Sequence, residues 1–186
     1  MGAHVNLTHH FLIAMPAMAD PRFANSLAFI CEHSADGTIA IVVNKPSDMT
    51  LSTLLRQIDV THVSRRFDAP VMQGGPMQAN HGFVLHRPLG KWQSTLAVSA
   101  EVGLTTSKDV LEAAARGDGP DDLLVSLGYA GWGAGQLEDE LAANAWLTVA
   151  ADADVMFDLP AERRLPAAMN LLGIDFSQLA EGAGHA

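Results

Sequence analysis

Four short polar segments have the residue types of a binding site. Each of them follows or ends a predicted strand. Residues 44–46 read Asn-Lys-Pro, 73–76 read Gln-Gly-Gly-Pro, 86–87 read His-Arg, and 105–107 read Thr-Thr-Ser. Strand ends commonly converge on one edge of a sheet, where pockets form. Their amides, hydroxyls and cations suit a small anion or a peptide carboxylate. The candidate ligand-binding residues are Asn44, Lys45, Gly74, Gly75, His86, Thr105, Thr106 and Ser107.

Two functions stay open for these loops. The first is a non-enzymatic binding or regulatory protein, whose partner is another protein or a small anionic ligand. The second is an enzyme acting on a small anionic substrate, with Lys45, His86 and Thr106 as participants. No nucleophile or general base with its partners can be identified from the sequence, so no catalytic residue is assigned. A purely structural interpretation is also open, in which the glycine- and proline-containing segments are turns that the fold requires.

The glycine-rich stretch from residue 128 to 140 has the order strand, turn, helix, which in many proteins holds a phosphate. Three consecutive acids, Glu138 to Glu140, fall in the first helical turn and would repel one. The glycine spacing matches neither a P-loop nor a dinucleotide fingerprint. We therefore expect no cofactor here, and predict instead that Trp132 and Tyr129 anchor the turn onto the core.

Cys31 and His33 would share one face of a strand and could form a thiolate–imidazole pair. Neighbours two apart on a strand stand side by side, however, and a buried cysteine is commonly unreactive. We predict that Cys31 is structural. The adjacent His9 and His10 have no zinc-ligand spacing to the other histidines, so no metal site is predicted.

Length and composition predict one domain with a substantial core. The chain has 186 residues, of which 48% are hydrophobic. We expect a single compact domain over residues 1–178, or two intimately packed lobes within it, and a poorly ordered tail at 179–186. A single cysteine suits a reducing compartment, and no stretch approaches the ~18 apolar residues of a membrane span. We therefore expect a cytoplasmic protein without a membrane partner.

The charge of the chain argues against a nucleic-acid partner. The formal net charge is −10. Residues 1–93 carry seven Lys/Arg and six Asp/Glu, whereas residues 94–186 carry four and fifteen, which gives +1 and −11. Acidic surface repels phosphates, and no helix-turn-helix or basic helix is evident. We expect no direct sequence-specific DNA binding, and an anionic ligand should approach the N-terminal part.

Hydrophobic periodicity predicts a mixed α/β (α+β) fold with a largely antiparallel or mixed β core and about four flanking helices. Strands grouped in hairpins, without a regular βαβ repeat, argue against a doubly wound Rossmann sheet. Thr50 and Thr106 are predicted helix caps, and Pro166 predicts that the last helix begins no earlier than about Arg163. The predicted strands are 11–15, 27–33, 38–43, 71–73, 83–87, 95–99, 104–105, 123–129, 146–149 and 154–157, and the predicted helices are 51–58, 107–115, 135–145 and 162–172.

Several segments in a fixed order give the chain a family resemblance. They include Leu-Thr-His-His-Phe-Leu-Ile-Ala-Met-Pro at 7–16, Ile-Val-Val-Asn-Lys-Pro at 41–46, Gln-Gly-Gly-Pro at 73–76, Gly-Phe-Val-Leu-His at 82–86 and the glycine-rich stretch at 128–140. Over nearly its whole length the chain resembles the AlgH/YqgE family of bacterial proteins. The resemblance implies the same mixed fold but no settled activity; some members are labelled transcriptional regulators, a role we expect to be indirect. Leu165 and Pro166 depart from the family pattern.

Overall fold

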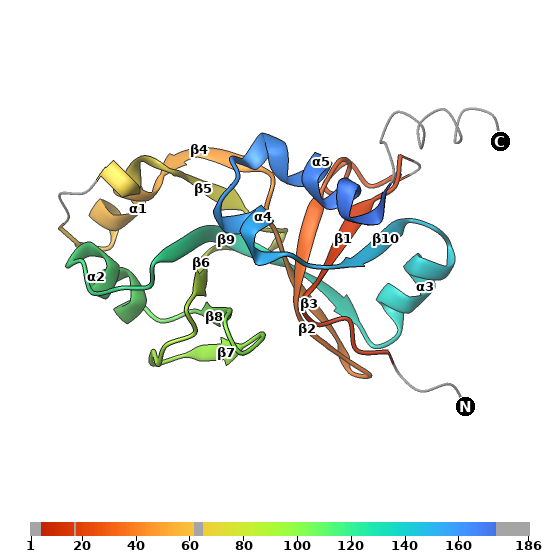
Figure 1. Ribbon diagram of the computed structural model, residues 1–186, viewed down its shortest axis with the longest axis horizontal. Helices are drawn as coiled ribbons and strands as arrows, with labels where there is room; N and C mark the ends of the chain where they lie inside the picture. Colours follow the sequence, from red (N-terminus) through yellow and green to blue (C-terminus); the bar gives the residue numbers. More distant parts are fainter. Residues whose placement is uncertain (1–4, 17, 62–64, 174–186) are drawn as a thin grey trace.

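The computed structural model describes residues 5–16, 18–61 and 65–173, and ten strands of this part form one curled sheet (Figure 1). Eight follow the order β10-β1-β2-β3-β9-β6-β8-β7, while β5 joins through β9 and β4 pairs with β5. All pairings are antiparallel except that of β5 with β9. The strands are β1 His10–Ala14, β2 Leu27–Ser34, β3 Gly37–Val42, β4 Pro46–Thr50, β5 Pro70–Gln73, β6 Met77–Arg87, β7 Thr95–Ala97, β8 Gly103–Thr105, β9 Asp122–Gly133 and β10 Trp146–Ala150.

Five α-helices and one short 3-10 helix accompany the sheet in the described residues, which confirms the predicted mixed α/β class. The side chain of Thr50 accepts a hydrogen bond from the Thr53 amide, so the predicted cap of the first helix is confirmed. The helices are α1 Leu51–Gln57, η1 Arg65–Asp68, α2 Asp109–Ala115, α3 Gln136–Ala142, α4 Ala153–Phe157 and α5 Ala161–Leu172.

The structure corrects several predicted elements, including the strand predicted at 83–87, which begins at Met77. Residues 154–157 were expected to be a strand but belong to α4, because the Asp152 carboxylate caps the Asp154 amide and starts a helical turn. The helix α5 begins at Ala161, before Arg163, and carries Pro166 in its interior. The cap of α2 is Lys108 rather than Thr106, because the Thr106 amide donates to the carbonyl of Ser94 in the neighbouring loop.

The long strand β9 joins the two halves of the molecule. The strand was predicted to end near residue 129, but it continues to Gly133, and only Ala134 and Gly135 separate it from α3. Its first half lies between β5 and β6, whereas its second half pairs with β3. Gly37 opens β3 with φ 144°, and a Cβ there would lie 2.5 Å from the Trp132 carbonyl oxygen. The close approach of the β3 and β9 backbones therefore requires glycine at position 37.

Apolar residues of the sheet are buried on both faces, so its inner strands have nearly continuous hydrophobic sequences. In β1, Phe11 and Ile13 face α4 and α5, while Leu12 and Ala14 belong to the opposite cluster beside α3. A third cluster joins α1, α2 and β5 around Phe67. No helix among the described residues is long and apolar enough to cross a membrane. The tail predicted to be poorly ordered, 179–186, lies outside the described residues.

Candidate functional site

A cavity of about 310 Å³ lies where the start of α5 meets β4, β5 and the first half of β9. Figure 1 shows the first turn of α5 beside β4. The walls are mostly apolar, and the charged side chains among them are Arg164 and Glu162. The lining residues are Pro46, Leu51, Ala69, Pro70, Met72, Leu123, Leu124, Val125, Pro160, Ala161, Glu162 and Arg164. Volumes of this size are at the lower end of those seen for small-molecule sites.

Arg164 is held in this cavity by main-chain carbonyls rather than by an acid. Its Nε donates to the Leu159 carbonyl at 3.0 Å, and Nη1 donates to the Val43 carbonyl at 2.6 Å. Nη1 also lies 3.8 Å from the Met72 sulfur. Among the residues that the structure describes, Nη2 has no hydrogen-bond partner and no carboxylate lies within 4.0 Å of the guanidinium. The two bonded nitrogens, Nε and Nη1, fix the plane of the guanidinium. The Nη2 edge is left available to a ligand.

Burial dominates the electrostatics of Arg164. The apolar walls remove water from the guanidinium and lower its pKa to about 10, with nearby Glu162 opposing the shift. The side chain is therefore still a cation at neutral pH. A half-buried cation without an acidic partner carries a desolvation cost that a bound anion would offset.

The first turn of α5 adds a second positive feature to the same cavity. Pro160 is the N-cap and offers no side-chain hydrogen bond to the first helical amides, which lack intrahelical partners. The positive end of the helix dipole therefore contributes to the potential at Pro160, Ala161 and Glu162. Glu162 is exposed and adds a negative charge, so the cavity suits one negative charge better than a polyanion.

The predicted site residues fall into separate groups. Asn44 and Lys45 lie next to Gly74 and Gly75, because the Gln73 amide donates to the Lys45 carbonyl. Lys45 and Gly75 line an open hollow of about 200 Å³ with Arg22. Asn44 accepts from the Leu27 amide and donates to the Asn25 carbonyl, and Lys45 Nζ donates to the Ala24 carbonyl at 2.6 Å. These contacts hold the turn together.

The two glycines of that group have a structural reason to be glycines. A Cβ on Gly74 would lie 2.3 Å from the Gly128 carbonyl oxygen. A Cβ on Gly75, whose φ is 152°, would lie 2.2 Å from the carbonyl group of Tyr129. The backbone of this turn crosses directly against β9, and any larger residue would push the two apart.

His86 and Thr105 form the second group, inside the protein. Both are fully buried. His86 Nδ1 lies 3.0 Å from the Pro88 carbonyl oxygen, which can only accept, so Nδ1 carries the proton and Nε2 accepts from the Thr105 hydroxyl at 2.7 Å. Thr95 Oγ1 lies 2.8 Å from Thr105 Oγ1 and extends the chain of hydrogen bonds. Burial lowers the pKa of His86, which keeps the ring neutral near pH 7.

These groups are distant from one another along β9. Gln73 lies opposite Leu127 on one side of the strand, and His86 lies opposite Leu123 on the other side. Four residues of strand correspond to roughly 13 Å. Thr106 and Ser107 lie with the second group: the Thr106 amide donates to the Ser94 carbonyl, and Ser107 Oγ donates to Asp109.

Cys31 and His33 do not form a thiolate–imidazole pair. Cys31 is buried and donates to the Phe29 carbonyl, and burial raises the pKa of its thiol. His33 instead accepts from the Leu7 amide at Nδ1 and meets Glu138 at Nε2, 2.6 Å away. The described residues contain no cluster of three or more His, Cys, Asp or Glu side chains that could hold a metal ion.

Two of the three acids of α3, Glu138 and Glu140, bind protein groups rather than only solvent, which the sequence interpretation missed; Glu140 also lies beyond the first helical turn in which it was predicted. Glu140 Oε1 accepts from the indoles of Trp132 at 3.2 Å and Trp146 at 3.0 Å, and Oε2 accepts from Gln136. Trp132 is 7% exposed, which confirms its predicted position in the core. Tyr129 packs on Phe83 in a different cluster, so it does not serve the same turn.

Arg164 was not predicted as a site residue, although its position carried a signal. It falls three residues after Ala161 and four before Ala168, both of which are buried. On a helix these positions share one face, so the spacing places an arginine on the apolar stripe of α5. Its neighbour Arg163 is exposed, which is the usual position for the residue type.

Comparisons with known proteins identify relatives along the whole chain. The profile of the family described as AlgH-like matches residues 11–177. A UPF0301 protein of Nitrosospira multiformis is 59% identical over 185 residues, covering 98% of each chain. One from Dechloromonas aromatica is 57% identical over 184 residues, covering 98% of this chain and 99% of its own.

Two solved structures have the same fold. The solution structure of the AlgH protein from Pseudomonas aeruginosa is 47% identical and aligns with a TM-score of 0.81, covering 97% of this chain and 96% of its own. A crystal structure of a protein from Corynebacterium diphtheriae aligns with a TM-score of 0.69 at 19% identity, covering 89% and 86%. The second match shows likeness of fold alone.

Proposed function

We propose that this chain, which belongs to the AlgH-like family, is a non-enzymatic cytoplasmic binding protein that holds a small apolar monocarboxylate at Arg164. The observation that carries the proposal is a fixed guanidinium, in a mostly apolar cavity, with Nη2 unpaired among the described residues. A carboxylate accepting from Nη2 and from amides of the first α5 turn would offset the desolvation of the cation.

The shape and charge of the cavity support a ligand with an apolar body. Leu51, Pro70, Met72 and Leu124 would contact that body, and burying it supplies a favourable term of about 25 cal/mol per Å². A phosphate ester carries a second charge that Glu162 would oppose. The expected order of affinity is therefore apolar carboxylate, then small carboxylate, then phosphate.

Any effect on transcription would be indirect under this proposal. The net charge of −10 opposes DNA, so a ligand-dependent contact with another protein is the route that we propose. We further propose that residues 1–178 act as one domain, because the cavity takes residues from β4, β5, β9 and α5. Binding at this point would stiffen the contact between these elements.

The enzymatic alternative assigns Lys45, His86 and Thr106 to a reaction on a small anionic substrate. Weighing against it, Lys45 Nζ and both nitrogens of His86 have partners within the protein. The two proposals separate on turnover: a bound carboxylate that is recovered unchanged supports binding, and a product supports the enzyme.

The decisive experiment compares two adjacent arginines. Thermal shift and calorimetry with octanoate, benzoate and acetate, alongside octanamide, benzamide and phosphate, should show stabilisation by the apolar carboxylates. Saturation near 100 times Kd adds about 2.7 kcal/mol to the free energy of unfolding. Arg164→Met should abolish the shift, whereas the exposed neighbour in the control Arg163→Met should leave it unchanged. Equal responses in both variants, or equal binding of amides and acids, would reject the site.

A further inference from the structure

The second half of β9 leaves one edge of the sheet without a partner strand in the described part of the chain. The pairing of β6 with β9 runs from Arg87 to Gly82, breaks, and ends with Met77 opposite Tyr129. On the other side, β3 pairs with β9 as far as Gly133. From residue 130 to 133, therefore, β9 has a neighbour on one side only.

The direction of the β3 hydrogen bonds fixes which groups of β9 face the open side. The Val43 amide donates to Leu27 of β2, and the Val42 amide donates to Gly74 on the opposite side. The main-chain N–H and C=O groups of successive residues point to alternate sides of a strand. Those of Thr38 and Ala40 therefore point toward β9 and form hydrogen bonds with their partners Trp132 and Ala130. The intervening Gly131 therefore presents its N–H and C=O away from β3.

The N–H and C=O of Gly131 are the main-chain groups that this edge offers to a partner. It is exposed, and no described strand is paired with it beyond Met77. The next outward amide, that of Gly133, donates to Gln136 Oε1 at 3.0 Å, which ends the edge before α3. An exposed strand edge of this kind can accept another extended segment through main-chain hydrogen bonds.

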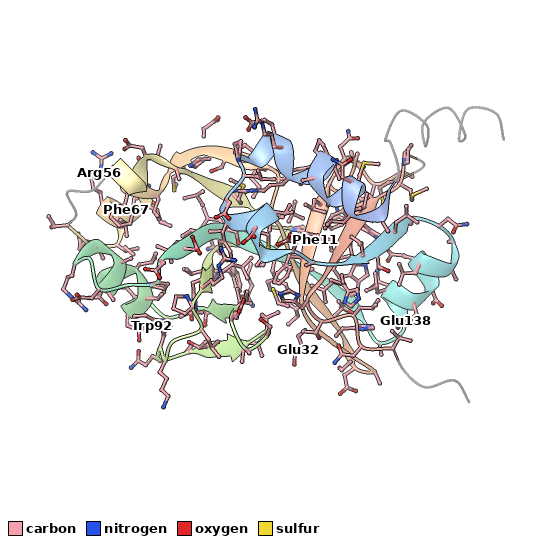
Figure 2. The ribbon with its side chains drawn as sticks, in the orientation of Figure 1. Phe11, Glu32, Arg56, Phe67, Trp92 and Glu138 are labelled. Carbon is pink, nitrogen blue, oxygen red and sulfur yellow. The ribbon has the colours of Figure 1, made fainter. Side chains whose placement is uncertain are left out.

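The surface beside this edge is hollowed and negatively charged. A shallow hollow of about 470 Å³ includes Gly131, Met77 and the carboxylates of Glu32 and Asp36, and its lining has no Lys or Arg. Neither carboxylate has a salt bridge among the described residues. Met77 is 47% exposed and gives this hollow an apolar contact surface. In Figure 2, Glu32 and Glu138 lie on different sides of the β2–β3 hairpin.

We propose that this β9 edge, defined by Gly131, Met77, Glu32 and Asp36, docks an extended peptide segment of a protein partner that carries Lys or Arg side chains. The peptide backbone bonds Gly131, its basic side chains meet the two carboxylates, and its apolar portions cover Met77. Gly131 lies six residues beyond Val125 of the Arg164 cavity, or roughly 20 Å along the strand. The surface is therefore distinct from the cavity.

The test uses a fluorescent, N-acetylated and C-amidated peptide of four Thr-Lys repeats, with a peptide of four Thr-Glu repeats as the matched opposite charge. Anisotropy should show saturable binding of the basic peptide that weakens as salt is raised, and no binding of the acidic one. In NMR spectra of the full chain, the amides of Gly131 and Met77 should shift. Absence of binding at millimolar basic peptide, or shifts confined to other strands, would overturn the proposal.

Variants assign the binding to the edge. The double variant Glu32→Lys/Asp36→Lys should weaken the basic peptide at least about tenfold, which corresponds to roughly 1.4 kcal/mol. The control Glu101→Lys/Asp118→Lys changes the net charge equally at exposed positions and should stay within about twofold. Gly131→Pro removes the donor, and a loss of up to about tenfold is expected. Equal weakening by both charge variants would reduce the binding to nonspecific charge, and self-association that competes with the peptide would assign the edge to a second copy.

Discussion

Arg87 and Arg164 differ in their partners: carboxylates surround the guanidinium of Arg87, whereas main-chain carbonyls hold that of Arg164. Arg87 donates to Asp122 and Asp154, each at 2.8 Å, and Asp158 lies 3.8 Å away. Its guanidinium also stacks 5.3 Å from the Phe157 ring centroid. These contacts fasten α4 to the first residue of β9 and the last residue of β6. Arg164 has carbonyls for partners and no carboxylate within 4.0 Å among the described residues.

The pKa shifts follow the same contrast. The carboxylates raise the pKa of Arg87, with Asp154 the larger contributor, whereas burial lowers the pKa of Arg164.

Glu140 resembles Arg87 in having hydrogen-bond partners within the protein, since two indoles and an amide donate to its oxygens. A charged group with complete internal partners stabilises the fold, and one with an unmatched donor in a cavity costs stability unless a ligand completes it. The difference separates a structural region from a candidate binding region.

The largest expected effect concerns the satisfied region at α3. Trp132→Ala should lower the free energy of unfolding by roughly 3–5 kcal/mol, because it empties a buried site and removes one donor to Glu140. Urea denaturation measures the loss. Carboxylate binding by the folded variant should be unchanged. A loss below about 1 kcal/mol would reject Trp132 as an anchor and bring the turn into consideration as a ligand surface.

Arg87→Met should cost less, about 1–3 kcal/mol, since the substitution leaves three carboxylates close together without their cation. The side chains of Asp154 and Asp158 are largely exposed, so solvent screening keeps the effect moderate. Chemical denaturation at low and high salt measures it, and the loss should shrink in high salt. A neutral result would remove Arg87 from the structural side of the comparison.

A still smaller effect should appear in the pH dependence of stability. Because the pKa of His86 is lowered from 6.5 in the folded state, the unfolded chain takes up a proton that the folded chain refuses as the pH falls below about 6.5. Stability contributed by neutral His86 is present above that pH and declines below it. The free energies of unfolding at pH 7.5 and 5.5 should therefore differ less in His86→Gln than in the parent. An identical difference would show that His86 is uncoupled from folding.

The sequence predicted the parts of the fold that depend on local signals. Continuous apolar runs located β1, β2 and β3, and the threonine cap located α1. It failed at α4, because five residues are too few to separate a helix from a strand by periodicity. The site depends on non-local geometry: Arg164 and Val43 are 121 residues apart in sequence, and no local pattern predicts that contact.

The candidate loops show the same limit. Strand ends were expected to meet on one edge, but β5 joins the sheet parallel to β9 while β6 runs antiparallel on the other side. Lys45 and His86 therefore belong to different regions. Where side chains meet depends on strand order, and strand order depends on pairing between segments that are distant in sequence.

The smallest expected effect on stability distinguishes the two arginines directly. Arg164→Met removes two hydrogen bonds, to the carbonyls of Leu159 and Val43, which is unfavourable. It also removes a desolvated cation without an acidic partner, and replacing such a charge by an apolar side chain of similar volume is often neutral or stabilising. The two terms oppose each other, so the free energy of unfolding should change by less than about 1 kcal/mol. Urea denaturation beside Arg87→Met measures this, and a loss as large as that of Arg87→Met would show that Arg164 is as structural as Arg87.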